Sequence, residues 1–198
     1  MDVVATLERR IGGRWISIEF HMNSQPVEEP AESPMPVCEA VQEAYVRPLV
    51  LTPELVNCPG ALRSLGWSKD DRSLSGKIMP SSDVAPEIES ELIENTPRID
   101  RPVRAVTVGG DGNADLFVSC LQPVDVMNLI RRWQLSTGSD VEVNLSNVMA
   151  VCGNILVRAY LSHKICMSFG CMSSMDKNET EGNRLLVGIP NDLIQQIL

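Results

Sequence analysis

One segment of the sequence is apolar almost throughout, and it limits the folds that the chain can adopt. Residues 147–161, NVMAVCGNILVRAYL, carry a single charged side chain, Arg158. A helix with apolar side chains on every side is stable only when other elements cover it. We therefore expect a buried helix here, enclosed by the rest of the domain.

The other segments predict a mixture of strands and helices. Strands are expected at 14–20, 103–108, 116–121, 141–145, at the start of 164–171 and at 184–190. Helices are expected at 37–46, 85–95, 123–138 and 191–198, with two short helical turns within 52–66. Because strands and helices do not alternate strictly, we predict a single α+β or α/β domain over residues 1–198, with a mixed sheet packed by helices.

Helical spacing also predicts which side chains face the core. In 123–138 the expected buried stripe is Val126, Met127, Ile130 and Trp133. In 85–95 the expected apolar face is formed by Ile88, Leu92 and Ile93.

Residues 25–36 contain four prolines and three glutamates. This composition predicts an extended loop or linker outside the core.

Composition argues against two classes of partner. The net charge of −9 and an aromatic content of 4% disfavour nucleic-acid binding, which needs clustered basic and stacking side chains. No apolar run reaches the length of about 18 residues that a membrane span needs. The segment 1–13 lacks the basic start and apolar run of a signal peptide, so we expect a cytoplasmic protein.

Six cysteines are many for a chain of this kind. In a reducing compartment they are either buried thiols or metal ligands. No two of them are spaced as Cys-x2-Cys, so a metal site must be assembled from distant segments. Cys120 and Cys166 lie in expected strands, where packing explains them.

Local context favours the other four cysteines as ligands. Cys58 stands at a helix start in NCPGALRSLGW, where free backbone N–H groups stabilise a thiolate. Cys38 stands at another expected helix start, and Cys171 follows Gly170 in an expected turn. Cys152 lies in the apolar segment and could point to the same place.

Two further motifs give little support to other functions. The stretch VGGDGNAD lacks the third glycine of a dinucleotide-binding loop and predicts a glycine-rich hairpin instead. The two histidines, His21 and His163, have no nearby serine or cysteine in a nucleophile context, so a hydrolytic triad is not supported.

Several blocks together resemble one family. PVCEAVQEAY, LTPELVNCPGALRSLGW, NLSNVMAVCGNILVRAYL, MSFGCMSS and LLVGIP follow the order and spacing of domain of unknown function 169, an uncharacterised group of anaerobic archaea and bacteria. The resemblance runs from about residue 35 to the C-terminus, and WISIEF is similar to the family's first strand. It implies that Cys38, Cys58, Cys152 and Cys171 are the recurrent cysteines.

We therefore expect these four cysteines to bind an iron–sulfur cluster, with zinc as the second choice. The expected role is electron transfer, sensing or maturation of another metalloenzyme, with a redox or metalloenzyme partner; a homo-oligomer is also compatible with the sequence. A metal-free binding or interaction domain with structural cysteines is the alternative. A thiol enzyme that uses Cys58 is a third hypothesis.

Overall fold

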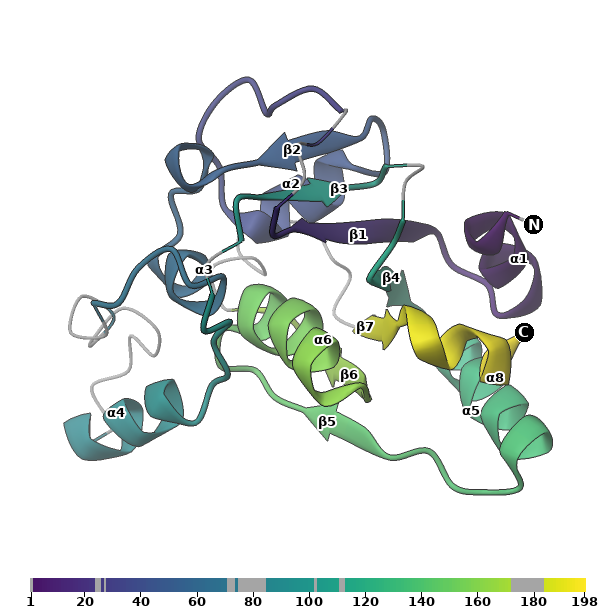
Figure 1. The fold of residues 1–198 in the computed structure, drawn as a ribbon. Helices are drawn as coiled ribbons and strands as arrows, with labels where there is room; N and C mark the ends of the chain where they lie inside the picture. The colour runs from purple at the N-terminus through teal and green to yellow at the C-terminus, as the bar shows by residue number, and fades with distance from the viewer. Residues whose placement is uncertain are drawn as a thin grey trace.

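The computed structural model describes residues 2–23, 26, 28–70, 74, 85–101, 103–110, 113–171 and 184–198. In these ranges a mixed sheet is covered by helices on both faces, and the two termini lie on the same side of the molecule (Figure 1). The domain is α+β, so the structure selects one of the two predicted fold classes.

The described residues form a sheet of seven strands in the order β2-β3-β1-β4-β7-β6-β5. The strands are β1 (Trp15–His21), β2 (Leu49–Leu51), β3 (Ala105–Val108), β4 (Leu116–Leu121), β5 (Val143–Leu145), β6 (Ile165–Ser168) and β7 (Leu185–Pro190). Neighbouring strands are antiparallel except β5 and β6, which are parallel.

The helices are short, and the longest one described is α5. They are α1 (Val3–Arg10), α2 (Val37–Glu43), α3 (Pro59–Ser64), α4 (Pro86–Glu94), α5 (Pro123–Thr137), η3 (Ala150–Arg158), α6 (Ala159–Ser162) and α8 (Ile194–Ile197), with short 3-10 turns η1 (Pro53–Leu55) and η4 (Asn191–Leu193). No helix in the described ranges is long and apolar enough to cross a membrane.

Successive side chains of β1 face two different cores, because side chains alternate between the faces of a strand. Ile16 and Ile18 face the first core, which contains residues of α2, α3, α4, η3 and α6. Trp15 faces the second core, which contains residues of α1, α5 and α8. Cys152 belongs to the first core.

The apolar segment 147–161 is helical and buried, as predicted, but most of it is a π-helix. η3 covers Ala150–Arg158, and all of its residues from 150 to 157 are buried. The N–H of Asn154 donates to the carbonyl of Met149 at 3.2 Å, which is the i→i+5 bond of this helix type. π-helical turns are rare and occur frequently at functional sites.

A glycine in the sheet lets η3 lie close to β7. A Cβ at Gly188 would be 2.4 Å from the carbonyl oxygen of Ile155. The Asn154 side chain donates to the carbonyl of Met167 at 2.8 Å and ties η3 to β6. The π-helix is therefore fixed against two strands by contacts with its own backbone and side chains.

The hairpin predicted at VGGDGNAD is wrong. β3 and β4 both pair with β1 from opposite sides, so the chain crosses β1 between them. The N–H of Gly109 donates to the carbonyl of Ser17 at 2.8 Å, and the N–H of Asp115 donates to that of Ile18 at 2.8 Å. Gly109 has a φ of +84°, a conformation that suits glycine in such a tight crossing.

The prediction that 25–36 lies outside the core also needs correction. Its described residues are extended as expected, and they run beside β2. The N–H of Ala31 donates to the carbonyl of Val50 at 2.9 Å, and that of Met35 donates to Leu55 at 3.0 Å. Ala31 and Met35 are buried in the first core, because backbone pairing holds this segment against the sheet.

Two helix faces differ from the predicted ones. In α5 the buried residues are Val126 and Leu129, whereas Met127 is 68% exposed. Met127 lies about 100° around the helix from Val126, away from the i, i+3, i+4, i+7 stripe. In α4, Ile93 is buried as predicted, but Ile88 is 54% exposed.

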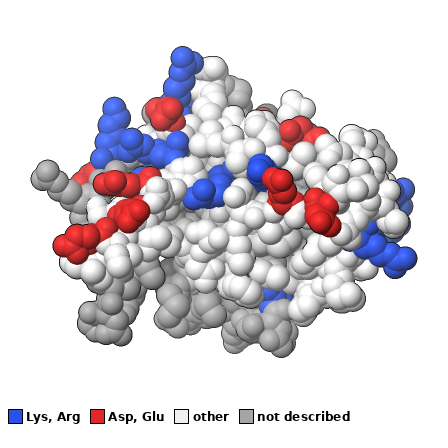
Figure 2. Space-filling model, turned by 90° about the horizontal axis from the view of Figure 1, so that it is seen from below, with Lys and Arg blue, Asp and Glu red and all other residues white. Residues whose placement is uncertain are grey.

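Charged side chains of both signs are interspersed on the face that Figure 2 shows, with uncharged residues between them. The described residues on this face therefore present no continuous field of one sign to a charged partner.

Candidate functional site

The four cysteines predicted as ligands lie at the ends of four different elements. Cys38 is the second residue of α2, Cys58 is the N-cap of α3, Cys152 is the third residue of η3, and Cys171 follows β6 by three residues. Cys152 is 4% exposed, and the other three are partly buried.

The structure brings these four thiols into electrostatic contact with one another. The Cys152 side chain interacts with that of Cys58, and its Sγ donates a hydrogen bond to the carbonyl of Met149 at 3.8 Å. Negative charge on Cys171 or on Cys58 raises the pKa of Cys38. Negative charge on Cys58 also raises the pKa of Cys171. Segments far apart in the sequence thus bring four thiols within electrostatic range of one another, and we call these four cysteines the thiol site.

The interaction between Cys58 and Cys152 shifts their pKa values in opposite directions. The interaction with Cys152 lowers the pKa of Cys58 from 9.0 to about 6, although burial opposes this. The same interaction, followed by burial, raises the pKa of Cys152 well above its usual value. Cys58 is therefore the more acidic of the two thiols, and Cys152 is the one that keeps its proton.

The other two members of the thiol site are neutral at pH 7. Burial raises the pKa of Cys38 to about 11, and the nearby charges of Cys171 and Cys58 add to this effect. Burial also raises the pKa of Cys171. One thiolate and three thiols are thus the expected state of the metal-free site.

Backbone N–H groups at three helix starts are hydrogen-bonded to sulfurs of the thiol site. The donors are Cys38 and Glu39 of α2 for Cys38, Gly60 and Ala61 of α3 for Cys58, and Ala150 and Val151 of η3 for Cys171. The N–H groups of Glu39 and Ala61 also donate to the carbonyls of Pro36 and Cys58 at 3.0 and 3.1 Å, so each is shared between a carbonyl and a sulfur. The N-terminal end of a helix favours negative charge. The site is therefore arranged to stabilise anionic sulfur.

Two glycines allow α3 and η3 to approach each other at the thiol site. A Cβ at Gly60 would be 3.0 Å from Cγ of Met149 and 3.8 Å from Sγ of Cys152. A Cβ at Gly153 would be 3.3 Å from Oγ of Ser64 in α3 and 2.6 Å from Cγ2 of Thr96, which follows α4. Met149 itself has a φ of +45°, an uncommon conformation for a residue with a side chain, directly before η3.

Sequence reasoning missed the roles of Gly60 and Met149. The sequence position of Gly60, directly after Cys58-Pro59, could have indicated its role. A side chain at this position would contact a residue that packs against Cys58. The positive φ of Met149 could not be predicted from the sequence, because it depends on how the π-helix begins.

The remaining two cysteines have other neighbours. The charged neighbour of Cys120 is Arg184, and that of Cys166 is Arg158. Cys166 is fully buried in β6 and accepts a hydrogen bond from the side chain of Asn144 at 3.8 Å. These surroundings agree with the packing role predicted for both.

The donor set of the thiol site fits a thiolate-bound metal. Four cysteines are the usual ligands of structural zinc and of iron–sulfur clusters. Hydrogen bonds from N–H groups to the sulfurs are one way in which proteins tune clusters. Among the residues that the structure describes, no group of three or more His, Cys, Asp or Glu side chains has the geometry to hold a metal ion. Metal binding by these cysteines stays a prediction.

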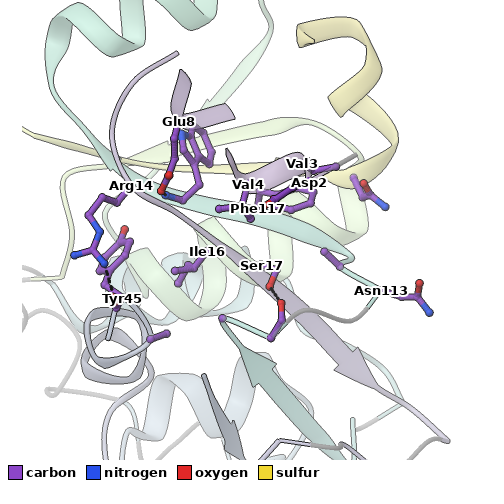
Figure 3. Close-up of a pocket in the computed structure, with 16 residues that line it drawn as sticks. Asp2, Val3, Val4, Glu8, Arg14, Ile16, Ser17, Tyr45, Asn113 and Phe117 are labelled. Atoms are coloured by element: carbon purple, nitrogen blue, oxygen red, sulfur yellow. Dashed lines mark hydrogen bonds between the residues drawn. The ribbon is translucent and has the colours of Figure 1, made fainter. Parts of the chain in front are cut away.

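A pocket of about 560 Å³ lies at the opposite end of α2, where Ala44 and Tyr45 line it. Arg14 lies over the Tyr45 ring, 5.1 Å from its centroid, and also donates to the Tyr45 carbonyl, so the two form one wall (Figure 3). Asp2 and Glu8 are the acidic residues of the lining.

Comparison with known proteins identifies the family of the chain, but no individual related protein. A family model for DUF169, described as an uncharacterised ArCR family, matches residues 14–198. No curated protein and no solved structure matches the chain.

Proposed function

The chain belongs to the uncharacterised DUF169 family, and we propose that it binds a metal centre through Cys38, Cys58, Cys152 and Cys171. An iron–sulfur cluster is the first choice, and zinc is the second. The role is electron transfer, sensing, or maturation of another metalloenzyme.

One observation supports the proposal, namely that four thiols influence one another electrostatically and that backbone N–H groups at three helix starts interact with three of their sulfurs. A metal bound by four thiolates has a net negative charge at its ligands, and burying such charge is costly unless donors stabilise it. The N–H groups of α2, α3 and η3 are such donors. Packing alone would explain the buried Cys152, but not three partly exposed thiols that each accept from a backbone N–H.

When bound, an iron–sulfur cluster would supply one-electron chemistry and zinc would supply structural stability. The chain's own residues hold the group and limit its access to water. Cys152 and the first core close the inner side, whereas Cys38, Cys58 and Cys171 are partly exposed. A redox or metalloenzyme partner could therefore approach the site from the side of these three cysteines.

We also infer a cytoplasmic location. None of the six cysteines, all of which lie in the described ranges, forms a disulfide. Thiols persist in reducing compartments, whereas oxidising ones favour disulfides.

The test is anaerobic purification followed by reconstitution with ferrous iron and sulfide. Iron and acid-labile sulfide per chain are measured together with the visible absorption spectrum, and zinc is measured before reconstitution. We expect a coloured protein whose visible absorption decreases on reduction with dithionite. Cys38→Ser, Cys58→Ser and Cys171→Ser should lose most of the iron.

The matched control is Cys120→Ser, which removes a partly buried cysteine outside the thiol site and should retain the wild-type iron content. A folded wild-type protein that takes up neither iron nor zinc would contradict the proposal. That result would favour the alternative, a metal-free binding domain, for which the pocket beside Arg14 and Tyr45 offers the binding site.

A further inference from the structure

We propose that the edge of the sheet at β5 is a dimerisation surface, at which β5 of a second copy of the chain adds in antiparallel orientation. The sheets of the two chains would then form one continuous sheet. The inference requires no metal and does not depend on the thiol site.

The two edges of the sheet lie at opposite ends, with β2 at the top and β5 at the bottom of Figure 1. At the β2 edge, the N–H of Ala31 donates to the carbonyl of Val50, and the N–H of Val50 donates to that of Glu29, both at 2.9 Å. This covering segment contains Pro30, which has no N–H to offer a further strand. Among the described residues, no strand pairs with the outer side of β5. Within these ranges the chain therefore covers one edge of its sheet and leaves the other open.

Contacts with β6 and its ends hold the β5 edge in place beyond the three residues of the strand. Before β5, the Glu142 carboxylate forms an ion pair with Lys164 at 2.6 Å. After β5, Oδ1 of Asn147 accepts a hydrogen bond from the N–H of Phe169 at 3.2 Å. Residues 142–147 are thus already ordered, so a partner strand would not have to order them on binding.

The backbone groups of Val143 and Leu145 point to the open side of β5. The N–H of Ser146 donates to the carbonyl of Met167 at 3.4 Å, so Ser146 faces β6. Alternate residues of a strand direct their N–H and C=O groups to opposite sides. Asn144 therefore also faces β6, whereas Val143 and Leu145 face away from it. Their outward N–H and C=O groups match the backbone of an added strand.

Apolar side chains beside the open edge are exposed. Val143 is 42% exposed, Leu145 is 62% exposed and Phe169 is 50% exposed. Proteins often protect such an edge with lysine or proline. The segment 141–147, VEVNLSN, contains neither, and its only charged residue, Glu142, is in the ion pair described above. The sequence of this edge therefore favours pairing with another strand.

A second copy of the chain fits this edge without bringing like charges together. In an antiparallel pair with a two-fold axis at Asn144, Val143 lies opposite Leu145 of the partner subunit. Each such pair can exchange two N–H···O=C bonds, because both residues face outward. Glu142 lies opposite Ser146 of the partner subunit, so the two Glu142 carboxylates stay apart. The edge is thus complementary to itself in both hydrogen bonding and charge.

The paired segment is short, so the interface is small and the dimer should dissociate on dilution. Sedimentation equilibrium of the full-length protein, kept reduced so that no disulfide links two chains, measures the association from micromolar to near-millimolar concentration. We expect the mass to rise from 21.8 kDa toward twice this value as the concentration increases.

Amide hydrogen exchange measured by NMR at the lowest and highest concentrations locates the contact. The N–H groups of Val143 and Leu145 should become protected only at high concentration. Those of Asn144 and Ser146 should be protected at both concentrations, because they face β6.

Two substitutions act on different parts of the contact. Val143→Pro removes an N–H that β6 does not use, so it should abolish the dimer and preserve the fold. Leu145→Lys places a positive charge of each subunit in the apolar contact and should weaken the dimer by about tenfold or more. Val46→Lys is the matched control, because Val46 is 86% exposed and precedes β2 at the opposite end of the sheet. It should associate like the wild type, and circular dichroism shows whether each variant is folded.

Three results would overturn the proposal. The first is a wild type that stays a monomer at every concentration, as expected if the partner is a strand of another protein. The second is a dimer that persists in Leu145→Lys and in any folded Val143→Pro protein. The third is a dimer that Met127→Lys dissociates and Leu145→Lys does not, because the contact would then lie on the exposed side of α5.

Discussion

At the scale of single residues, the character of Cys58 depends on a neighbour that is distant in the sequence. The helix start supplies N–H donors, but the largest effect on the pKa of Cys58 is the interaction with Cys152. Burial acts in the opposite direction on the same thiol. Cys58 is thus the more acidic of the two thiols because the second, buried thiol keeps its proton.

This dependence predicts how Cys58 is alkylated in the metal-free protein. The rate of its reaction with iodoacetamide should rise with pH and reach half its maximum near pH 6, where the thiolate forms. In Cys152→Ala the midpoint should move upward by about one pH unit or more, because the interaction with Cys152 is lost. Peptide mass spectrometry of samples alkylated across a pH series measures both midpoints.

Cys120→Ala is the control for this measurement and should leave the midpoint unchanged. An unchanged midpoint in Cys152→Ala would mean that the helix start alone stabilises the thiolate.

The residues of the thiol site were only partly predictable from the sequence. Cys58 and Cys38 were recognised because proline and good helix formers mark a helix start locally. That they meet Cys152 and Cys171 could not be predicted from spacing, since it depends on α2, α3 and η3 packing on the same side of the sheet. The family resemblance selected the same four cysteines but gave no geometry.

At the scale of elements, η3 connects the thiol site to the sheet. Its first turn carries Cys152 and donates N–H groups to Cys171, while its middle lies against Gly188 of β7. A displacement of this helix would therefore move one ligand and two donors together.

We predict that Gly188→Ala destabilises the protein and disturbs the thiol site. The new Cβ would meet the carbonyl oxygen of Ile155 at 2.4 Å, so the helix must shift. Overpacking of this kind costs about 1–3 kcal/mol of unfolding free energy. Urea denaturation followed by circular dichroism measures the loss, and metal content after reconstitution should fall in the same variant.

Gly138→Ala at the end of α5 is the comparison, because no atom lies within 4 Å of a Cβ there. It should lose only about 1 kcal/mol, owing to its positive φ, and keep the wild-type metal content. Equal losses in both variants would show that the contact between η3 and β7 has no special importance.

Most elements were predicted, including the short strands β3, β5 and β6, whereas β2, α1 and the π-helical form of η3 were not. α5 and β1 have clear periodicity, and the structure confirms both. β2 has three residues, too few to show any alternation. α1 was missed although Asp2 caps it and Arg9 and Arg10 favour its end. The π-helix was predicted only as a helix, because a segment that is apolar on every side has no period to measure.

At the scale of the whole molecule, the first core determines the protonation of the thiol site. Burial is the main cause of the raised pKa values of Cys38 and Cys171, and it also contributes to that of Cys152. A metal that binds four thiolates must therefore displace protons that the core retains. Metal affinity should increase as the pH rises.

Zinc binding makes this prediction quantitative. At pH 7.5 three of the four thiols are protonated and Cys58 is not, so loading should release about three protons and the affinity should rise about a thousandfold per pH unit. Calorimetric titration in buffers with different ionisation enthalpies counts the protons. Cys58→Ala should bind more weakly yet still release about three, whereas Cys38→Ala should release about two. Release of one proton or fewer by the wild type would show that the core does not keep these thiols neutral.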